Sequence, residues 1–262
     1  MNTQFHCNTN NTPSLEGFFR DHPIVAIAFS GGVDSAYLLY AASQCATRFR
    51  AYYVKTAFQP QFELEDAMRI AREVAAEMTV IPLEVLSDEE IRSNTPKRCY
   101  YCKRKIFSAI RERARQDGFK VLLDGTNASD ESSDRPGMVA LQELAVLSPL
   151  RMCGLTKQAI RELSREAGLF TWDKPAYACL ATRIPFGRPI DEGLLQRTEQ
   201  AEDYLLSLGF RDFRVRTLGE AAKIQISAQQ LPLLMLHRKE IVQECKKAYG
   251  SVLLDLETRD EQ

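Results

Sequence analysis

Several features that define common protein classes are missing from this sequence. It has no apolar run near the ~20 residues that cross a bilayer, and its net charge of −1 gives no basic footprint for nucleic acid. Its one Cys-x-x-Cys pair has no second pair and no histidine nearby in sequence, which argues against a zinc finger. The polar start, residues 1–11, predicts no secretory signal. We therefore expect a cytoplasmic protein that binds neither membranes nor nucleic acids.

The remaining composition is that of an ordinary globular protein. The chain has 262 residues, of which 45% are hydrophobic and 26% charged, enough for one large domain and one small one. Its seven cysteines follow no regular framework. In a chain of this length they indicate a reducing compartment, where they act as thiols or as metal or cluster ligands.

The most informative stretch is the turn Ser30-Gly31-Gly32-Val33-Asp34-Ser35. It follows an apolar run that begins at Ile24 and leads into an apolar-periodic helix over residues 36–46. A tight glycine turn at a helix start directs backbone N–H groups and the positive helix end at one point, which predicts an anion site. The lysine and Ser/Thr of a Walker A loop are absent. An ordinary strand–turn–helix corner is the alternative.

Strands and helices alternate along the first two thirds of the chain. This order predicts an α/β fold, an open parallel sheet flanked by helices. After the first strand we expect further strands at residues 50–56, 79–85, 119–123 and 145–150, and helices at 60–77, 137–144 and 157–167. From about residue 189 the pattern becomes a helix (194–208), strands (213–217, 222–226), a helix (231–249) and a strand (252–256), which predicts a small C-terminal α+β domain. The expected divisions are 1–23, a lead-in with a short helix, then 24–187 and 188–262.

Three loops are expected to meet at one edge of this sheet. Ligands of open parallel sheets bind beyond the carboxyl ends of the strands. The segments 30–35, 56–59 and 124–127 (Asp-Gly-Thr-Asn) all follow predicted strands. Their convergence predicts an ATP site. Asp34 would bind Mg²⁺ or shape the loop there, and a purely structural helix cap is the alternative.

The cysteines suggest a second site. Cys99 and Cys102 start a basic helix, where two thiolates can share a metal or a cluster, although redox chemistry or plain packing fits as well. Cys179 is the natural third partner, because it lies in a Pro-bounded loop with Arg183, a side chain suited to phosphate or carboxylate. A buried cysteine beside a structural arginine is the alternative. Cys153 is a weak fourth ligand candidate, Cys45 and Cys245 read as packed hydrophobes, and Cys7 as part of a tail.

Arg214 and Arg216 alternate along the first C-terminal strand and so share one face. Two guanidinium groups side by side suit a substrate phosphate. A solvated ladder with Asp212 or Glu220 is the alternative. Glu199 and Glu202, on the preceding helix, are weaker candidates for positioning a metal or substrate, since a helical glutamate is by default on the surface.

These motifs together resemble the LarE family, sulfur transferases of the PP-loop ATP pyrophosphatase superfamily that mature the nickel-pincer cofactor of lactate racemase. The resemblance rests on Ala28 to Ser35, Arg98 to Lys103, Asp124 to Asn127, Lys174 to Gly187, and Gly209 to Arg216. Residues 30–35 resemble the PP-loop, and this motif alone marks only the superfamily. The Cys179 segment and the Arg-Val-Arg strand, residues 214–216, are much more specific to the LarE family.

The resemblance implies that ATP adenylates a carboxylate of a pyridinium dicarboxylate mononucleotide, and that sulfur then displaces AMP. Sulfur comes either from the cysteine at position 179, which becomes dehydroalanine, or from a [4Fe-4S] cluster held by three cysteines. With both members of the Cys-x-x-Cys pair present, the sequence resembles the cluster type, with Cys99, Cys102 and Cys179 as ligands. The resemblance also implies a homo-oligomer. It leaves the source of the sulfide unknown. The expected ATP-binding residues are Ala28, Phe29, Ser30, Gly31, Gly32, Asp34, Ser35, Thr56, Gly125 and Thr126; Cys179, Arg183 and Asp34 are the catalytic candidates, and Arg214 and Arg216 hold the substrate phosphate.

Two other enzyme classes share the PP-loop. A tRNA thiolase would need a strongly basic surface, against which the charge of −1 argues. An amide-forming ligase would use ammonia, and Cys99 and Cys102 would then be structural. A nucleotide-binding regulatory module that is not an enzyme would leave the Cys179 loop without a purpose.

Overall fold

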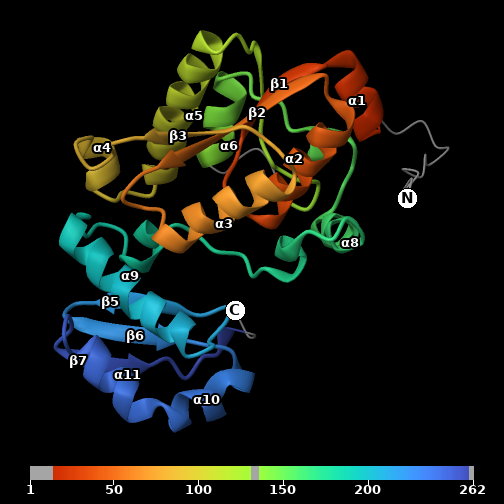
Figure 1. The fold of residues 1–262 in the computed structure, drawn as a ribbon. Coiled ribbons are helices and arrows are strands. Elements are labelled where there is room, and N and C mark those ends of the chain that lie inside the picture. The colour runs from red at the N-terminus through yellow and green to blue at the C-terminus, as the bar shows by residue number, and fades with distance from the viewer. Residues whose placement is uncertain (1–13, 131–135, 260–262) are drawn as a thin grey trace. The chain divides into compact units, whose positions relative to one another are not determined.

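The computed structural model describes residues 14–130 and 136–259, so Cys7 and most of the expected lead-in lie outside it. The chain forms two compact units (Figure 1). The first unit comprises the residues up to Lys55, Gln61–Leu83 and Tyr100–Lys174. The second comprises Thr56–Pro60, Glu84–Cys99 and the chain from Pro175 onward.

The first unit is built on a four-stranded parallel sheet of order β3-β2-β1-β4. Its strands are β1 (Ile24–Ala28), β2 (Arg48–Lys55), β3 (Met78–Pro82) and β4 (Val121–Leu123). The expected open parallel sheet flanked by helices is therefore confirmed. Because β1 lies between β2 and β4, the loop that follows β1 leaves the middle of the sheet's carboxyl edge, where such sheets bind ligands.

Alternating side chains of the strands fill two separate cores. Val25 and Ile27 of β1 face a core that contains Leu38 of α2 (Val33–Cys45). The intervening Ala26 belongs to the opposite core, with Tyr52 and with side chains of α5 (Arg98–Gln116). Burial on both faces explains why β1 reads as a continuous apolar run in the sequence.

The other helices of this unit cover the sheet (Figure 1). α2 is central and buried on most of its surface, whereas α8 is strongly amphipathic and begins at a Thr156 side-chain cap. Short α1 contributes Phe18 and Phe19 to the core. The bounds are α1 (Leu15–Asp21), α3 (Gln61–Glu73), α6 (Pro136–Glu143), α7 (Pro149–Met152), α8 (Lys157–Glu166) and the 3-10 turn η1 (Phe170–Asp173).

The second unit contains a three-stranded sheet of order β5-β6-β7, in which β5 and β6 are antiparallel and β6 and β7 parallel. This is the small mixed α+β structure that the sequence predicts. Helix α9 packs Ala201 and Leu205 onto the sheet with Phe210 and Phe213. The bounds are α4 (Glu89–Arg92), η2 (Leu180–Arg183), α9 (Glu192–Ser207), β5 (Arg214–Leu218), β6 (Ala221–Gln225), η3 (Ala228–Gln230), α10 (Leu231–Leu236), α11 (Arg238–Cys245) and β7 (Ser251–Leu254).

Two elements differ from expectation. The fifth strand at residues 145–150 is reduced to one bridge, Leu147 to Leu123, because Ala145 has a left-handed φ of 48° and Pro149 starts α7. The helix expected over 231–249 is interrupted at His237, which separates α10 from α11. Within the described ranges, no helix is both long and apolar enough to span a bilayer.

Candidate functional site

The turn between β1 and α2 requires glycine at position 31. Gly31 has a φ of +74°, a left-handed conformation that other residues rarely adopt. A Cβ there would also lie 3.1 Å from the Cβ of Ala67 on α3. The next residue, Gly32, is the N-cap of α2 and supplies no side-chain cap to the first helical turn. The first N–H groups of α2 are not taken by an N-cap side chain, and the anion site expected there stays a prediction.

Two serines hold the ends of this turn together. Ser35 Oγ donates to the carbonyl of Gly32 over 3.2 Å, and the Ser30 N–H donates to Ser35 Oγ over 3.3 Å. The two hydroxyl oxygens are 3.1 Å apart. Of the other expected ATP-binding residues, Ala28 ends β1 and Phe29 is buried, with its N–H donating to Tyr52 O. Their expected role in ATP binding stays a prediction.

The loop after β4 lies against the same helix start. A Cβ on Gly125 would lie 2.9 Å from the backbone nitrogen of Ser35, closer than real Cβ contacts. Only glycine allows the two loops to approach this closely. Beside it, Asp124 is buried and accepts hydrogen bonds from the hydroxyls of Thr126 and of Ser148, the latter over 2.6 Å. The structure thus brings Gly125 to the start of α2. The expected roles of Gly125 and Thr126 in ATP binding stay predictions.

Two lysines that the sequence analysis did not assign to this site lie at the PP-loop. Lys157, from the start of α8, pairs with Asp34 over 2.5 Å, and Asn127 Nδ2 donates to the other Asp34 oxygen over 3.4 Å. Lys174 pairs with Asp66 over 2.7 Å, and its Nζ lies 3.5 Å from Gly31 O. The sequence Thr156-Lys157 could have indicated the position of Lys157. Thr156 predicts a helix start, and a lysine there is unfavourable beside the positive end of the helix dipole unless an anion lies nearby.

Asp34 does not present a ready Mg²⁺ ligand here. Its carboxylate type suits the ion, but it is already paired with Lys157. No group of three His, Cys, Asp or Glu side chains is gathered as metal ligands in the described part of the chain. The role of Asp34 as a Mg²⁺ ligand stays a prediction.

Thr56 follows β2 directly and belongs to the second unit. It is buried, and its hydroxyl donates to Gln59 Oε1 over 2.7 Å while accepting from the N–H of Phe58 over 3.0 Å. Its hydroxyl therefore closes its own turn. The structure leaves its expected role in ATP binding as a prediction.

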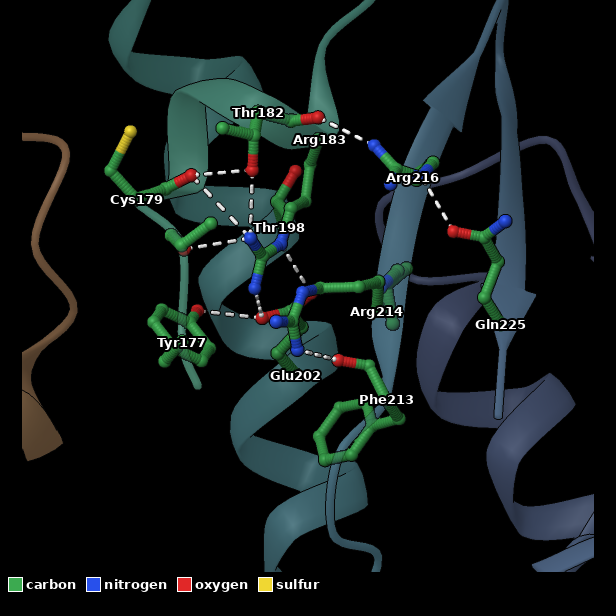
Figure 2. A network of polar contacts seen from close by, with 12 residues as sticks. Tyr177, Cys179, Thr182, Arg183, Thr198, Glu202, Phe213, Arg214, Arg216 and Gln225 are labelled. Atoms are coloured by element: carbon green, nitrogen blue, oxygen red, sulfur yellow. Dashed lines mark hydrogen bonds and ion pairs between the residues drawn. The ribbon is translucent and has the colours of Figure 1, made fainter. Parts of the chain in front are cut away.

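Cys179 precedes the 3-10 turn η2 in what we call the Cys179 loop, residues 175–187. The loop is fixed mainly by side chains that bind its backbone carbonyls (Figure 2). Arg183 Nη1 donates to Ala178 O over 2.7 Å, and Arg214 Nη2 donates to Ala176 O over 2.6 Å. Arg216 Nη1 donates to Thr182 O over 2.7 Å. Figure 2 shows the Cys179 sulfur pointing away from these arginines.

Arg183 forms a buried ion pair with Glu202 of α9. The Nε–Oε1 and Nη2–Oε2 distances are 2.9 and 3.0 Å, and both side chains are at most 1% exposed. Glu202 also accepts from Tyr177 OH over 2.6 Å and from Val215 N over 2.8 Å. The default surface position for Glu202 is therefore wrong. The carboxylate is held by four donors, and Arg183 serves the loop and Glu202 rather than an open phosphate site.

Arg214 and Arg216 extend from β5 on one face, as predicted. Arg214 is buried, and burial together with the nearby charges of Arg183 and Arg259 lowers its pKa to about 10. Burial and Arg183 also lower the pKa of Arg216, whose Nε donates to Gln225 Oε1 over 2.5 Å. Asp212 lies 3.8 Å from Arg214 Nη1. Arg214 is buried rather than solvated, and the role of the two arginines in holding a substrate phosphate stays a prediction.

Arg98, the first residue of α5, ties the Cys-x-x-Cys turn to the Cys179 loop. It is buried, and its Nη1 donates to Ala181 O over 3.0 Å. Its Nη2 is 3.7 Å from Cys99 Sγ. Asn94 accepts from Arg98, and its side-chain nitrogen lies within hydrogen-bonding distance of the carbonyls of Ile184, Pro185 and Arg188, at 2.8 to 3.3 Å. The sequence analysis had not assigned Asn94 to a site.

The three cysteines fit an iron-sulfur cluster in donor type. Cys99 is exposed and Cys102 half-buried, one turn apart on α5, and Cys99 is near enough to Cys179 to affect its pKa. Burial raises the pKa of the Cys179 thiol, although Arg98 and Arg183 oppose this. No three metal-ligating side chains converge among the residues described. The expected cluster role of Cys99, Cys102 and Cys179 stays a prediction.

The remaining described cysteines have ordinary positions. Cys245 is buried in the core of the second unit, as predicted, and Cys45 packs against the core of the first. Cys153 ends α7 and is buried in the first unit, which raises its pKa. Its role as a fourth ligand stays a prediction.

Comparison with known proteins agrees with this geometry. The family described as "Asparagine synthase" matches residues 19–133, the part that carries the PP-loop. An uncharacterized protein of Synechocystis sp. is 33% identical over 251 residues, covering 93% of this chain and 92% of the relative. The tRNA-specific 2-thiouridylase MnmA of Thermotoga petrophila is 26% identical over 187 residues, 55% of this chain and 52% of the relative.

A further relative has a named activity and matches nearly from end to end. The pyridinium-3,5-bisthiocarboxylic acid mononucleotide synthase of Lactiplantibacillus plantarum is 30% identical over 246 residues, 93% of this chain and 89% of the relative. The match extends over both the PP-loop and the Cys179 loop. The chain therefore belongs to the family of that synthase, the LarE family, and is an ATP-dependent enzyme of the PP-loop superfamily.

Proposed function

We propose that the protein is an ATP-dependent sulfur transferase that converts a carboxylate of a pyridinium dicarboxylate mononucleotide into a thiocarboxylate. The observation that carries this proposal is the likeness to the Lactiplantibacillus synthase over 93% of the chain. The geometry supports it, because one unit holds an anion-binding PP-loop and the other a thiol on a loop fixed by arginines.

In the activating step a substrate carboxylate oxygen attacks the α-phosphorus of ATP. The bond to the β-phosphate oxygen breaks, pyrophosphate leaves, and an acyl-adenylate forms. The N–H groups at the start of α2 are directed at the pyrophosphate, and Lys157 and Lys174 bring positive charge to the same turn. Mg²⁺ bound to ATP offsets further charge when it is present.

In the transfer step the sulfur at Cys179 attacks the acyl carbon, and AMP leaves with the electron pair of the broken C–O bond. If Cys179 supplies its own sulfur, a thioester joins it to the substrate. Removal of the Cys179 α-proton then breaks the Cβ–Sγ bond, leaving dehydroalanine and releasing the thiocarboxylate. Arg214 and Arg216 are proposed to hold the substrate phosphate.

The cysteine set supports a second source of sulfur. We propose Cys99, Cys102 and Cys179 as the residues that would hold a [4Fe-4S] cluster, which would supply a labile sulfide in place of the Cys179 sulfur. Anaerobic purification should then give a brown protein containing iron and sulfide. Intact Cys179 after several turnovers would support the cluster, whereas loss of its sulfur after one turnover would support sacrifice. Iron-free protein that is fully active would contradict the cluster.

The decisive test is incubation with ATP and the pyridinium dicarboxylate mononucleotide. We expect AMP, pyrophosphate and a product whose mass rises by the replacement of oxygen with sulfur. The Cys179→Ala variant should lose the thiocarboxylate but keep pyrophosphate release, whereas Cys45→Ala, in the other unit, should keep both. Release of ADP would contradict the PP-loop chemistry.

The same incubation separates the other PP-loop chemistries. The partial match to tRNA-specific 2-thiouridylase favours tRNA as the next substrate to test, and the "Asparagine synthase" family match favours ammonia. Thiolated tRNA or an amide product, with no thiocarboxylate, would replace the proposal. A homo-oligomer is expected and can be checked by light scattering.

A further inference from the structure

Arg214 and Arg216 of β5 donate hydrogen bonds to the Cys179 loop at equal distances in sequence on either side of Cys179. Arg214 binds the carbonyl of Ala176, three residues before Cys179, and Arg216 binds the carbonyl of Thr182, three residues after it. Both distances, 2.6 and 2.7 Å, are those of charge-assisted hydrogen bonds. The two arginines come from one strand and one face, so they act as a rigid pair.

The two arginines are themselves held in place. Arg214 Nη1 donates to Phe213 O over 2.6 Å, and Arg216 Nε donates to Gln225 Oε1. The Arg214 guanidinium carbon lies 5.4 Å from the centre of the Tyr177 ring, and that of Arg183 lies 4.5 Å from the same ring. Tyr177 is in turn fixed by its hydrogen bond to Glu202. The loop is thus fixed to a buried network rather than to mobile surface groups.

We infer that Arg214 and Arg216 are positioning residues for Cys179, so that the side chains proposed to hold the substrate phosphate also fix the residue that delivers sulfur. The part that concerns phosphate rests on the proposed function. A guanidinium has five N–H donors, and the contacts described use two in each arginine. An anion can therefore bind while the carbonyls stay bound. Bound phosphate would then tighten the loop around Cys179.

The rate of iodoacetamide reaction at Cys179, followed by peptide mass spectrometry on the whole protein without ATP or substrate, tests the positioning role. In Arg216→Gln we expect this rate to rise about threefold to tenfold, as loss of a hydrogen bond to a charged group opens the loop more often. Arg214→Gln should do the same. Arg216→Lys, which keeps one cationic donor, should restore most of the protection.

Two controls separate positioning from general unfolding. Arg188→Gln removes an arginine whose Nη1 donates to Gly219 O over 2.8 Å, outside the Cys179 loop, and should leave the Cys179 rate unchanged. Alkylation of Cys45, in the first unit, should be equal in all variants. If Arg214→Gln fails to fold, the half-buried Arg216 still gives the answer. A Cys179 rate in Arg216→Gln within twofold of the unmodified protein would overturn the inference.

The effect of inorganic phosphate on Cys179 alkylation distinguishes phosphate binding from a purely structural role of the two arginines. Added phosphate should slow Cys179 alkylation in the unmodified protein and have no effect in Arg216→Gln. Slowing to the same extent in both would overturn the shared role of the arginines. Because no sulfur transfer is measured, the outcome is independent of whether the proposed reaction is correct.

Discussion

The PP-loop and the Cys179 loop, which carry the two halves of the proposed reaction, are held by different kinds of contact. The PP-loop depends on backbone geometry, with Gly31 in a left-handed conformation, and its two lysines are each paired with a carboxylate. The Cys179 loop depends on buried arginines that bind its carbonyls. The PP-loop should therefore be sensitive to substitutions that add atoms, and the Cys179 loop to substitutions that remove a charge.

The largest effect should come from breaking the buried ion pair of the second unit. Glu202→Gln leaves Arg183, whose side chain is fully buried, without a counter-charge. We expect the free energy of unfolding to fall by about 3–5 kcal/mol, measured by urea denaturation. The matched change in the first unit, Asp34→Asn, affects a pair that is one fifth to one third exposed and should cost about 1 kcal/mol or less. Equal losses of unfolding free energy in Glu202→Gln and Asp34→Asn would show that the two ion pairs do not differ in strength as expected.

The next effect should appear at the PP-loop when a single methyl group is added. Gly125→Ala places a Cβ 2.9 Å from the Ser35 backbone nitrogen, which must shift the start of α2. ATP–pyrophosphate exchange should fall by about 100-fold, as expected for a displacement near 1 Å in an active site. Gly137→Ala is the control, because the atoms nearest to its Cβ would belong to the flexible Lys103 side chain. Unaltered exchange in Gly125→Ala would show that this loop is not part of the ATP site.

An acid-dependent effect is expected in the second unit. Hydrogen bonds from Lys223 and Gln225 lower the pKa of Asp255 below its ordinary value. A carboxyl group whose folded pKa is lowered stabilises the protein above its unfolded pKa of about 3.9, and this stabilisation is lost as the pH falls toward the folded pKa. Asp255→Asn should therefore lower stability at neutral pH and flatten its decline between about pH 5 and pH 2. Exposed Glu162→Gln, in the first unit, should keep the original slope in the same titration.

The smallest effect should come from the second lysine of the PP-loop. Asp66→Asn removes the carboxylate that pairs with Lys174, and because this ion pair is partly exposed it should lower stability by about 1 kcal/mol or less. The freed lysine still lies beside Gly31 O, so pyrophosphate exchange should be retained. A loss of exchange comparable to that of Gly125→Ala would mean that the lysine is held in place by Asp66.

The sequence was sufficient wherever local patterns determine structure. The parallel sheet follows from strands such as β1 that are apolar without interruption, and the PP-loop follows from a contiguous glycine turn. The arginines of the site could be identified from the sequence, but the residues that they contact could not. Whether Arg183 would bind a ligand or Glu202 depends on how α9 packs, and no local pattern encodes contacts between residues nineteen positions apart.

The same limit applies to residues whose role comes entirely from distant partners. Asn94 and Lys174 stand in ordinary loop sequences, and only the fold shows that one binds carbonyls near residue 185 and the other pairs with Asp66. The broken helix at His237 is a similar case, since the apolar pattern continues across it.

Asn94 also has a consequence for how the protein reaches its working state. Its contacts with Ile184, Pro185 and Arg188 join segments 90 to 94 positions apart in the chain, and closing so long a segment has an entropic cost that short-range contacts avoid. The Cys179 loop is therefore expected to order late, after the sheets on which it depends. Most of the first unit leaves the ribosome before Cys179 is synthesised, so the thiol that is proposed to react takes its place only in a chain that is otherwise nearly folded.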